Sequence, residues 1–334
     1  MMVEKQIDCA LQKLVRFEKM LEQRIFERVD ELEIQMYPTM ERLHEIPSPE
    51  KFGPCEKGTQ WGGEGAYCWI RGTYTVPKKL DGKDLYIYPR MGYYEGLLWV
   101  DGKPYGNFAS KLGNHYCNLI MAKARAGQKI ELAIEFYAGH YIPGSWYEKE
   151  EKPDFLYQVE GIDICVKNQE ILDYALDLKA LNQMAEVMNK NSFRRADIVN
   201  TLLKVHQIVP YDIDNADPGE FEESMRQAET LMKEKLALHN SPSAPYAGLI
   251  GHSHMDTAWL WTIAETEKKC ARTYSNQISL MDQYPEYTFI QSSAFHNEML
   301  RRDYPALFAD IQKKVAEGRY EPNGGVWIEC DCNI

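Results

Sequence analysis

The sequence predicts a multidomain protein of α and β structure: an N-terminal helix plus a β-sandwich of jelly-roll type, a helical linker, and the start of a (β/α) barrel. Its 334 residues exceed what one compact core usually takes. Short runs rich in aromatic and β-branched residues fill 66–168, whereas strand-like runs alternate with helical periodicity in 246–334. We therefore expect domain boundaries that separate 1–65, 66–168, 169–245 and 246–334.

Composition excludes several classes of protein. A content of 44% hydrophobic and 12% aromatic residues is typical of an ordered chain, and a net charge of -12 without a basic stripe argues against a nucleic-acid partner. The N-terminus has no apolar signal core, and the eight cysteines are scattered, which predicts free thiols in the cytoplasm. No apolar run approaches the roughly 20 residues of a membrane-spanning helix, so we expect a soluble protein with no membrane partner.

The first 65 residues predict one helix and a connection. Apolar residues recur at steps of three, four and seven over 3–29, which is typical of an amphipathic helix whose apolar stripe docks on another element. Residues 37–65 are rich in proline and glycine and predict an extended, irregular segment.

Residues 66–168 predict a sandwich of short strands. Asp101 and Gly102 lie between two such runs and are typical of a tight hairpin turn. Tyr93, Tyr94 and Trp99 look like an exposed aromatic cluster, but we expect core and hairpin packing rather than a sugar platform. The predicted strands are 67–76, 85–89, 96–100, 116–121, 130–137 and 159–166.

Helical periodicity returns over 169–240, and the proline- and serine-rich segment 240–245 reads as a domain junction. Beyond it the pattern alternates as β-α-β-α-β, which predicts a parallel sheet or barrel with helices outside. The predicted elements are strand 246–250, a helix around 262–281, strand 287–290, helix 304–316 and strand 325–328.

The segment that follows the first of these strands carries polar side chains at alternating positions. His252, His254 and Asp256 come directly after the apolar run 247–250. If that run is a buried strand, period-two geometry points all three side chains toward the same side. The spacing therefore predicts a metal site in outline.

A further carboxylate, Asp331, follows the apolar run 325–328. Reactive groups gather at the carboxyl ends of parallel strands, so His254, Asp256 and Asp331 are expected to converge. One imidazole and two carboxylates suit zinc or a similar divalent ion, cobalt included. His252 sits closest to the strand, and we expect it to be a hydrogen-bonded imidazole of the core or one that supports a ligand.

Two tryptophans follow this cluster at once. Trp259 and Trp261 either form an aromatic face for the apolar side of a sugar ring or belong to the barrel core, and the residues alone leave both open. Cys330 and Cys332 flank Asp331, but a lone Cys-x-Cys is weak evidence for a thiolate site, so we expect buried small side chains.

Other functions remain in view. A metallo-β-lactamase pattern would need a histidine where Thr257 stands. A metal-dependent amidohydrolase or deacetylase is an open alternative, although it does not explain a strand-end Asp331 preceded by Trp327 and Glu329. A non-catalytic carbohydrate-binding module formed by 66–166 is the second alternative.

The order and spacing of these motifs resemble the start of the catalytic domain of glycoside hydrolase family 38, the class II α-mannosidases. The run His-Ser-His-Met-Asp-Thr-Ala-Trp-Leu-Trp at 252–261 and the closing run 318–333 carry most of the resemblance. Residues before 246 are similar in length and character to the N-terminal part of the cytosolic α-mannosidase branch. Further matching segments are 265–266, 272–273, 284–289 and 305–308.

The resemblance implies retaining, metal-dependent hydrolysis of terminal α-linked mannose from oligosaccharides. It implies that His254, Asp256 and Asp331 are ligands of a Zn²⁺ ion, that Asp331 is also the nucleophile, and that Trp259 lies near the substrate. A homo-oligomer is expected for the full-length protein. Linkage preference, oligomeric state and the choice between zinc and cobalt do not follow from the sequence.

The sequence stops three residues after Asp331, whereas a closed (β/α) barrel takes about 250 residues from its first strand. The family's fourth metal ligand and its acid/base carboxylate are expected beyond residue 334. We therefore expect an N-terminal fragment, with a truncated barrel and open strand edges, that shows no appreciable mannosidase activity alone.

Overall fold

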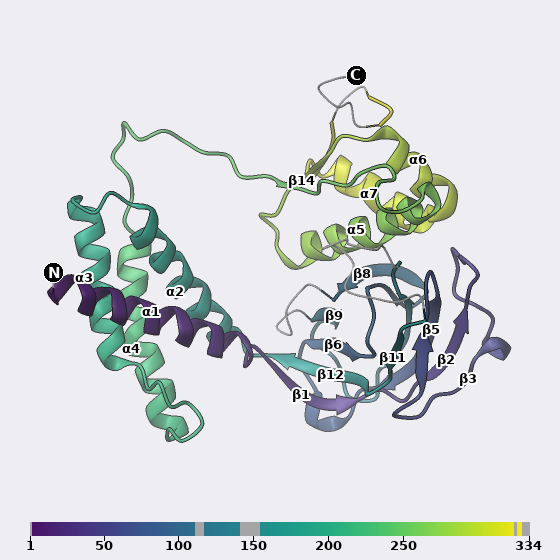
Figure 1. The fold of residues 1–334 in the computed structure, drawn as a ribbon, viewed down its shortest axis with the longest axis horizontal. Coiled ribbons are helices and arrows are strands. Elements are labelled where there is room, and N and C mark those ends of the chain that lie inside the picture. The colour runs from purple at the N-terminus through teal and green to yellow at the C-terminus, as the bar shows by residue number, and fades with distance from the viewer. Residues whose placement is uncertain (1, 111–116, 141–153, 324–325, 329–334) are drawn as a thin grey trace. The chain divides into compact units, whose positions relative to one another are not determined.

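The computed structural model describes residues 2–110, 117–140, 154–323 and 326–328. The chain divides into two compact units (Figure 1). We call the one formed by Met1–Glu27 and Lys167–Ala247 the helical unit, and the one formed by Arg28–Val166 and Gly248–Ile334 the sandwich unit.

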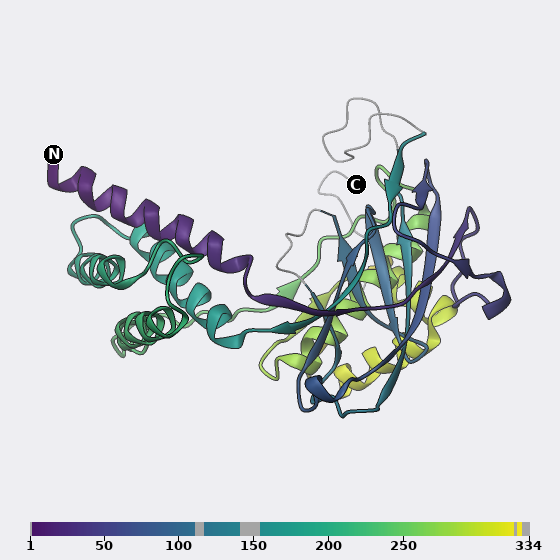
Figure 2. The same ribbon diagram turned by 90° about the horizontal axis from the view of Figure 1, so that it is seen from below.

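The helical unit is a bundle of four helices. Leu14, Phe17 and Leu21 of α1 are fully buried in the core that the unit's helices share. This amphipathic helix therefore docks on the bundle as expected (Figure 2). Side-chain oxygens cap the other helices at their N-termini, as where Asn168 accepts a hydrogen bond from the Ile171 amide. The helices are α1 (Met2–Glu22), α2 (Gln169–Val187), α3 (Phe193–Ile208) and α4 (Pro218–Leu236).

The N-terminal segment differs from the prediction in two ways. The helix ends at Glu22 rather than near 29, because Phe26–Glu31 forms a strand, β1, that lies beside β12 (Gly161–Lys167) in the sandwich. The apolar spacing of these residues is compatible with a helix or with a strand. The strand forms because Val29 packs on the sandwich core. Segment 37–65 is not wholly irregular either, since it contains parts of three strands and one 3₁₀ turn.

The sandwich consists of two antiparallel sheets. One has the strand order β1-β12-β6-β9 and the other β3-β2-β5-β10-β7-β8, with β4 and β11 forming a separate pair. The remaining strands are β2 (Gln35–Thr39), β3 (Gly53–Pro54), β4 (Gln60–Gly62), β5 (Tyr67–Thr75), β6 (Leu85–Arg90), β7 (Glu95–Val100), β8 (Lys103–Ala109), β9 (Asn118–Met121), β10 (Lys129–Tyr137) and β11 (Leu156–Gln158), with 3₁₀ turns η1 (Pro49–Lys51) and η2 (Lys78–Leu80). The predicted sandwich is therefore confirmed.

Strand β10 shows why the six-stranded sheet is buried on both faces. Ile130, Leu132, Ile134 and Phe136 alternate into the core between the two sheets. The intervening residues face the other way, and Ala133 belongs to a second core that helices of segment 248–334 complete. The sandwich thus carries those helices on the outer face of one sheet.

The predicted hairpin between β7 and β8 is present. Asp101 and Gly102 both have positive φ, 47° and 79°, as a turn matched to the right-handed twist of its strands requires. Tyr94 and Trp99 are buried, at 4% and 6% exposure, and Tyr93 packs on the sandwich core. The expectation that these aromatic residues pack internally is confirmed.

The described residues of segment 248–334 form a three-stranded parallel sheet, in the order β13-β14-β15, with three helices. The β-α-β-α-β alternation is confirmed, and Thr262 caps the first of these helices. One helix, α6, was not predicted. The elements are β13 (Gly251–His252), α5 (Ile263–Gln283), β14 (Phe289–Gln291), α6 (Ala294–Asp303), α7 (Pro305–Ala316) and β15 (Tyr320–Pro322).

Two predicted strands of this segment are wrong. Residues 246–250 are not a buried strand: Leu249 is 93% exposed, and the residues that pair with β14 are those of β13, which follow the apolar run. The third strand is β15 rather than 325–328, because Tyr320 enters the core while Val326, Trp327 and Ile328 stay partly exposed. In both cases the residues that pair in the sheet lie beside the apolar run rather than within it.

No helix of the described residues is both long enough and apolar enough to cross a membrane.

Candidate functional site at the carboxyl ends of the parallel strands

The segments that follow β13 and β14 are joined by hydrogen bonds. His252 Nδ1 lies 3.1 Å from the Ile290 carbonyl oxygen of the neighbouring strand. Five residues further on, Thr257 Oγ1 lies 2.8 Å from Nε2 of His296, a fully buried histidine of α6. His252 is therefore anchored to the sheet, and the turn after it is anchored to the helix that follows β14.

The segment that follows β15 reaches the same edge. The carbonyl oxygen of Trp327 accepts hydrogen bonds from the Phe295 amide at 2.8 Å and from Ser293 Oγ at 3.2 Å. The rings of Phe295 and Trp327 lie 5.4 Å apart. All three strand ends thus meet at one edge of the sheet, as parallel strands predict.

His254 and Asp256 lie together at this edge. Nε2 of His254 is 3.3 Å from Oδ1 of Asp256, and the two side chains are 79% and 39% exposed. The strand ends at His252, so extended alternation through Asp256 is not what brings them together. The loop after β13 brings the two side chains together, and it leaves both accessible to solvent.

This pair fits a zinc ion. Zinc binds imidazole nitrogen and carboxylate oxygen at about 2.0–2.2 Å in tetrahedral geometry, which separates two ligand atoms by roughly 3.3–3.5 Å. The observed separation of 3.3 Å falls in that range. His254 and Asp256 could therefore occupy two neighbouring corners of a tetrahedral site without moving.

The turn after Asp256 presents an aromatic ring. Trp259 is 53% exposed, and its ring meets that of Trp261 edge-on, at 5.7 Å between centroids and an angle of 88°. Neither ring belongs to a closed barrel core among the described residues. An exposed indole three residues after Asp256 is suited to stacking on a sugar ring.

The remaining predicted residues lie outside the described part of the chain. Asp331, expected as nucleophile and metal ligand, is not described, and neither are Cys330, Cys332 and Glu329. The last described residue before them is Ile328.

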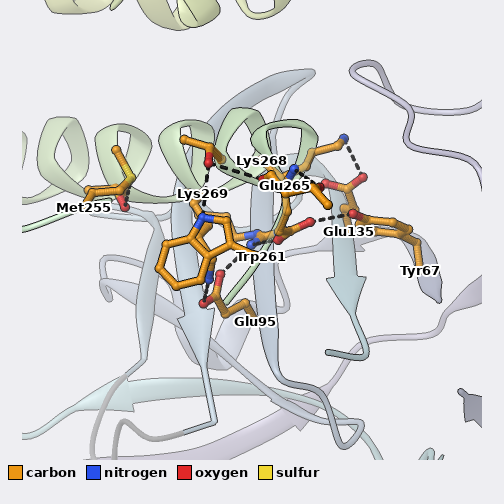
Figure 3. Close-up of polar contacts among 12 residues, drawn as sticks. Tyr67, Glu95, Glu135, Met255, Trp261, Glu265, Lys268 and Lys269 are labelled. Atoms are coloured by element: carbon orange, nitrogen blue, oxygen red, sulfur yellow. Dashed lines mark hydrogen bonds and ion pairs between the residues drawn. The ribbon is translucent and has the colours of Figure 1, made fainter. Parts of the chain in front are cut away.

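Beneath the turn lies a buried charged network that the sequence did not predict (Figure 3). Arg272 of α5 pairs with Glu265 of the same helix at 2.8 Å and with Glu95 of β7. Lys269 pairs with Glu95 at 2.6 Å, and the adjacent Lys268 pairs with Glu135 of β10 at 2.8 Å. The network ties α5 to the outer face of the six-stranded sheet.

The network shifts pKa values strongly. Burial raises the pKa of the Glu95 carboxyl, but the charges of Lys269 and Arg272 outweigh it and lower that pKa from 4.5 to about 2. Burial acts to lower the pKa of Arg272, yet Glu265 and Glu95 hold it well above its usual value. Glu95 and Arg272 therefore stay charged at neutral pH. Removing either one would leave an uncompensated buried charge.

A second group of possible metal ligands lies elsewhere in the sandwich unit. Ligand atoms of His44, Glu267 and Asp303 lie within 4.8 Å of one another, the only such group of three among the described residues. Arg302, however, pairs with both carboxylates, at 2.5 Å to Glu267 and 2.6 Å to Asp303. The guanidinium already binds both carboxylates, so we assign this cluster to ion pairing.

Comparison with known families matches two parts of the chain. Residues 246–334 match the model of the glycosyl hydrolases family 38 N-terminal domain. Residues 29–165 match the model of an α-mannosidase jelly-roll domain. The second match spans β1 to β12, so the sandwich as the structure builds it starts well before residue 66.

Individual relatives agree with these families. α-Mannosidase 2C1 of Mus musculus is 27% identical over 90% of this chain and 28% of its own length. α-Mannosidase G of Dictyostelium discoideum is 28% identical over 83% of the chain and 25% of its own length. The α-mannosidase of Saccharomyces cerevisiae is 43% identical over 86 residues. The chain thus spans about a quarter of the length of the first two relatives, and the third match covers 25% of this chain and 8% of that protein.

Similarity to solved structures is much weaker. A β-glucuronidase from Ruminococcus gnavus in complex with D-glucuronic acid is 12% identical over 42% of this chain and 29% of its own, with a TM-score of 0.29. That score is too low to support a shared fold.

Proposed function

We propose that the chain belongs to glycoside hydrolase family 38 and supplies part of the active site of a retaining, zinc-dependent α-mannosidase. The observation that carries this proposal is the pairing of His254 Nε2 with Asp256 Oδ1 at a zinc-compatible separation, at the carboxyl edge of a parallel sheet. The proposed substrate is the terminal α-linked mannose of an oligosaccharide, and the proposed location of the whole protein is the cytoplasm.

His254 and Asp256 would hold the ion together with Asp331, and His252 stays bound to the Ile290 carbonyl beside them. When bound, a divalent ion would hold the substrate through the neighbouring 2- and 3-hydroxyls of mannose. Zinc suits one imidazole and two carboxylates, and cobalt is the substitute to test.

Asp331 is the proposed nucleophile. In a retaining glycosidase one carboxylate attacks the anomeric carbon and forms a covalent glycosyl-enzyme, which water then hydrolyses. The leaving oxygen takes a proton from a second carboxylic acid, for which we assign no residue of this chain. Residues 326–328 are hydrogen-bonded to the start of α6, at the sheet edge where His254 lies. Asp331 follows Ile328 by three residues in the sequence.

Trp259 is the proposed platform for the sugar. Its ring is half exposed and follows Asp256 by three residues, so the apolar face of a sugar held near His254 and Asp256 can stack on it. The alternative of a carbohydrate-binding module gains no support, because Tyr94 and Trp99 of the sandwich are buried rather than available as a glycan surface.

Activity measurements on the whole protein test the proposal. We expect turnover of an aryl α-mannoside and none of an N-acyl substrate; the reverse would favour an amidohydrolase. Asp331→Ala should lower kcat at least a thousandfold, whereas the matched control Asp310→Ala, at a partly exposed position of α7, should leave it within twofold.

The nucleophile can be identified directly. A fluorinated mannosyl fluoride that traps the glycosyl-enzyme should label the peptide that contains Asp331, as detected by mass spectrometry. Labelling of another carboxylate would remove Asp331 from this role while leaving the mannosidase assignment in place. Light scattering on the whole protein tests the proposed homo-oligomer.

A further inference from the structure

We propose that the sandwich domain positions the sugar platform: Glu95 of β7 holds Lys269 beneath Trp261, and Trp261 in turn sets the orientation of Trp259. This inference rests on the proposed function, because it takes Trp259 as the residue that contacts the sugar. It adds a role that the sequence did not assign, since Glu95, Lys269 and Trp261 become positioning residues that need not touch substrate.

The turn that carries Trp259 is held on its inner side by one hydroxyl. Ala258 has φ +68°, a left-handed conformation that non-glycine residues adopt only when their surroundings impose it. Its amide donates to Oγ1 of Thr266 at 3.0 Å, and Trp261 Nε1 donates to the same oxygen at 3.1 Å. Thr266 is fully buried in α5. The turn is therefore fixed to the helix.

Trp261 is the support on which Trp259 rests. The Trp259 amide donates to the Trp261 carbonyl at 3.2 Å, and the two rings meet edge-on. Below, Lys269 Nζ lies 4.5 Å from the centroid of the Trp261 ring. A cation at this distance attracts the ring face, and the attraction is strongest where water is excluded. Lys269 is only 7% exposed.

Glu95 fixes the position of that cation. One carboxylate oxygen lies 2.6 Å from Lys269 Nζ, and the other pairs with Arg272, so both oxygens are held. Glu95 belongs to the sandwich and Lys269 to α5, so the contact joins the two parts of the sandwich unit (Figure 3). The path from sandwich to platform is continuous: Glu95, Lys269, Trp261, Trp259.

The neighbouring lysine provides a matched control. Lys268 is also buried, lies on the same helix and pairs with a glutamate of the same sheet, Glu135, at 2.8 Å. Its other contacts are the Leu43 carbonyl and the rings of Tyr67 and Tyr304, none of which lies in the 257–261 turn. Removing either ion pair should cost similar stability, but only the loss of Lys269 should disturb Trp259.

The kinetic test uses the whole protein and two double variants that remove both charges of a pair, so that no unpaired charge stays buried. In Lys269→Met with Glu95→Gln, we expect KM for an aryl α-mannoside to rise at least fivefold with kcat within twofold, because stacking on Trp259 is lost equally in ground and transition states. In Lys268→Met with Glu135→Gln both constants should stay within twofold. Lys269→Arg, which keeps the cation, should restore KM to within twofold of wild type.

A second readout does not depend on activity. In nitrogen-15 spectra of the 334-residue chain, assigned with Trp259→Phe and Trp261→Phe, the indole signals of both tryptophans should shift or broaden in the Lys269 variant and stay unchanged in the Lys268 variant. Equal responses in the two variants, or none, would overturn the inference. If a double variant does not fold, the single variants Glu95→Asp and Glu135→Asp replace the two double variants. Glu95→Asp should then raise KM and shift the indole signals, and Glu135→Asp should change neither.

The two readouts separate this inference from the function. An inactive wild type with the predicted indole changes would refute the mannosidase assignment and keep the support of Trp259 by Lys269. An active wild type whose two double variants had identical kinetics would keep the mannosidase assignment and refute the support of Trp259 by Lys269.

Discussion

Arg272 shows how much a single buried charge matters in this unit. Its guanidinium is 2% exposed and faces the carboxylates of Glu95 and Glu265. Arg272→Met leaves Glu265 without its cation in a buried place, so we expect the free energy of unfolding to fall by about 3–5 kcal/mol. Urea denaturation followed by tryptophan fluorescence measures this, since all seven tryptophans lie within the residue ranges of the sandwich unit.

Arg301→Met is the control for this prediction. Arg301 is 60% exposed and pairs with Glu298, which is 40% exposed, and a surface ion pair of this kind contributes little to stability. A loss for Arg272→Met no larger than that of the control would contradict the stabilising role of the network.

Glu95 gives the network a defined pH dependence. Its pKa of about 2 in the fold lies below the ordinary 4.5, so the stability it contributes is fully present above pH 4.5 and is lost as pH falls toward 2. That contribution is on the order of 3 kcal/mol. The difference in unfolding free energy between wild type and Glu95→Gln should therefore shrink over this range; a difference independent of pH would show that Glu95 titrates normally.

Residue-level prediction from sequence was uneven for physical reasons. The adjacency of His254 and Asp256 follows from their spacing, although a loop rather than a strand produces it. The buried network could not be predicted, because Lys268, Lys269 and Arg272 look like the solvated face of a helix until the six-stranded sheet packs on them. Glu135, a charge inside the apolar run of β10, was the one available hint.

At the scale of elements, the β7–β8 turn depends on the backbone conformation of Gly102. Its φ is +79°, and an added Cβ would meet no atom within 4 Å, so Gly102→Ala should cost about 1–2 kcal/mol through backbone strain alone. Gly53→Ala is the control, because Gly53 has equal space around it without a positive φ, and should change stability by less than about 0.5 kcal/mol. Equal urea midpoints for the two variants would contradict this.

Elements with strong local chemistry were predicted well. Thr262 marks the start of α5, Pro305 that of α7, and Asp101-Gly102 the hairpin, each through a backbone preference that needs no tertiary contact. The strands of 246–334 were misplaced because β13, β14 and β15 are only two or three residues long. Such short strands are defined by pairing partners rather than by their own apolar pattern.

At the scale of the molecule, sequence could not assign the first helix to its partners. It placed α1 with the irregular segment that follows, whereas the structure packs α1 with Lys167–Ala247 and gives the rest of 1–65 to the sandwich unit. Burial of Leu14 and Phe17 in the helical core, far along the chain from α2, decides this. Amphipathic spacing shows that a helix docks but not where.

The predicted behaviour of the 334-residue chain also belongs to this scale. Within residues 246–334, the part that the structure describes holds three short parallel strands, whereas a closed (β/α) barrel takes about 250 residues. We expect the 334-residue chain alone to show no measurable turnover of an aryl α-mannoside, under conditions in which the whole protein is active. Turnover by the isolated chain would mean that it holds every group the reaction needs.

The central claim is that His254, Asp256 and Asp331 hold one ion. Anomalous X-ray diffraction at the zinc absorption edge, from crystals of the whole protein with zinc, tests it most directly. The account predicts a peak about 2.0–2.2 Å from His254 Nε2, Asp256 Oδ1 and a carboxylate oxygen of Asp331. A zinc peak at His44, Glu267 and Asp303 instead, or one bound by His254 without Asp331, would contradict it.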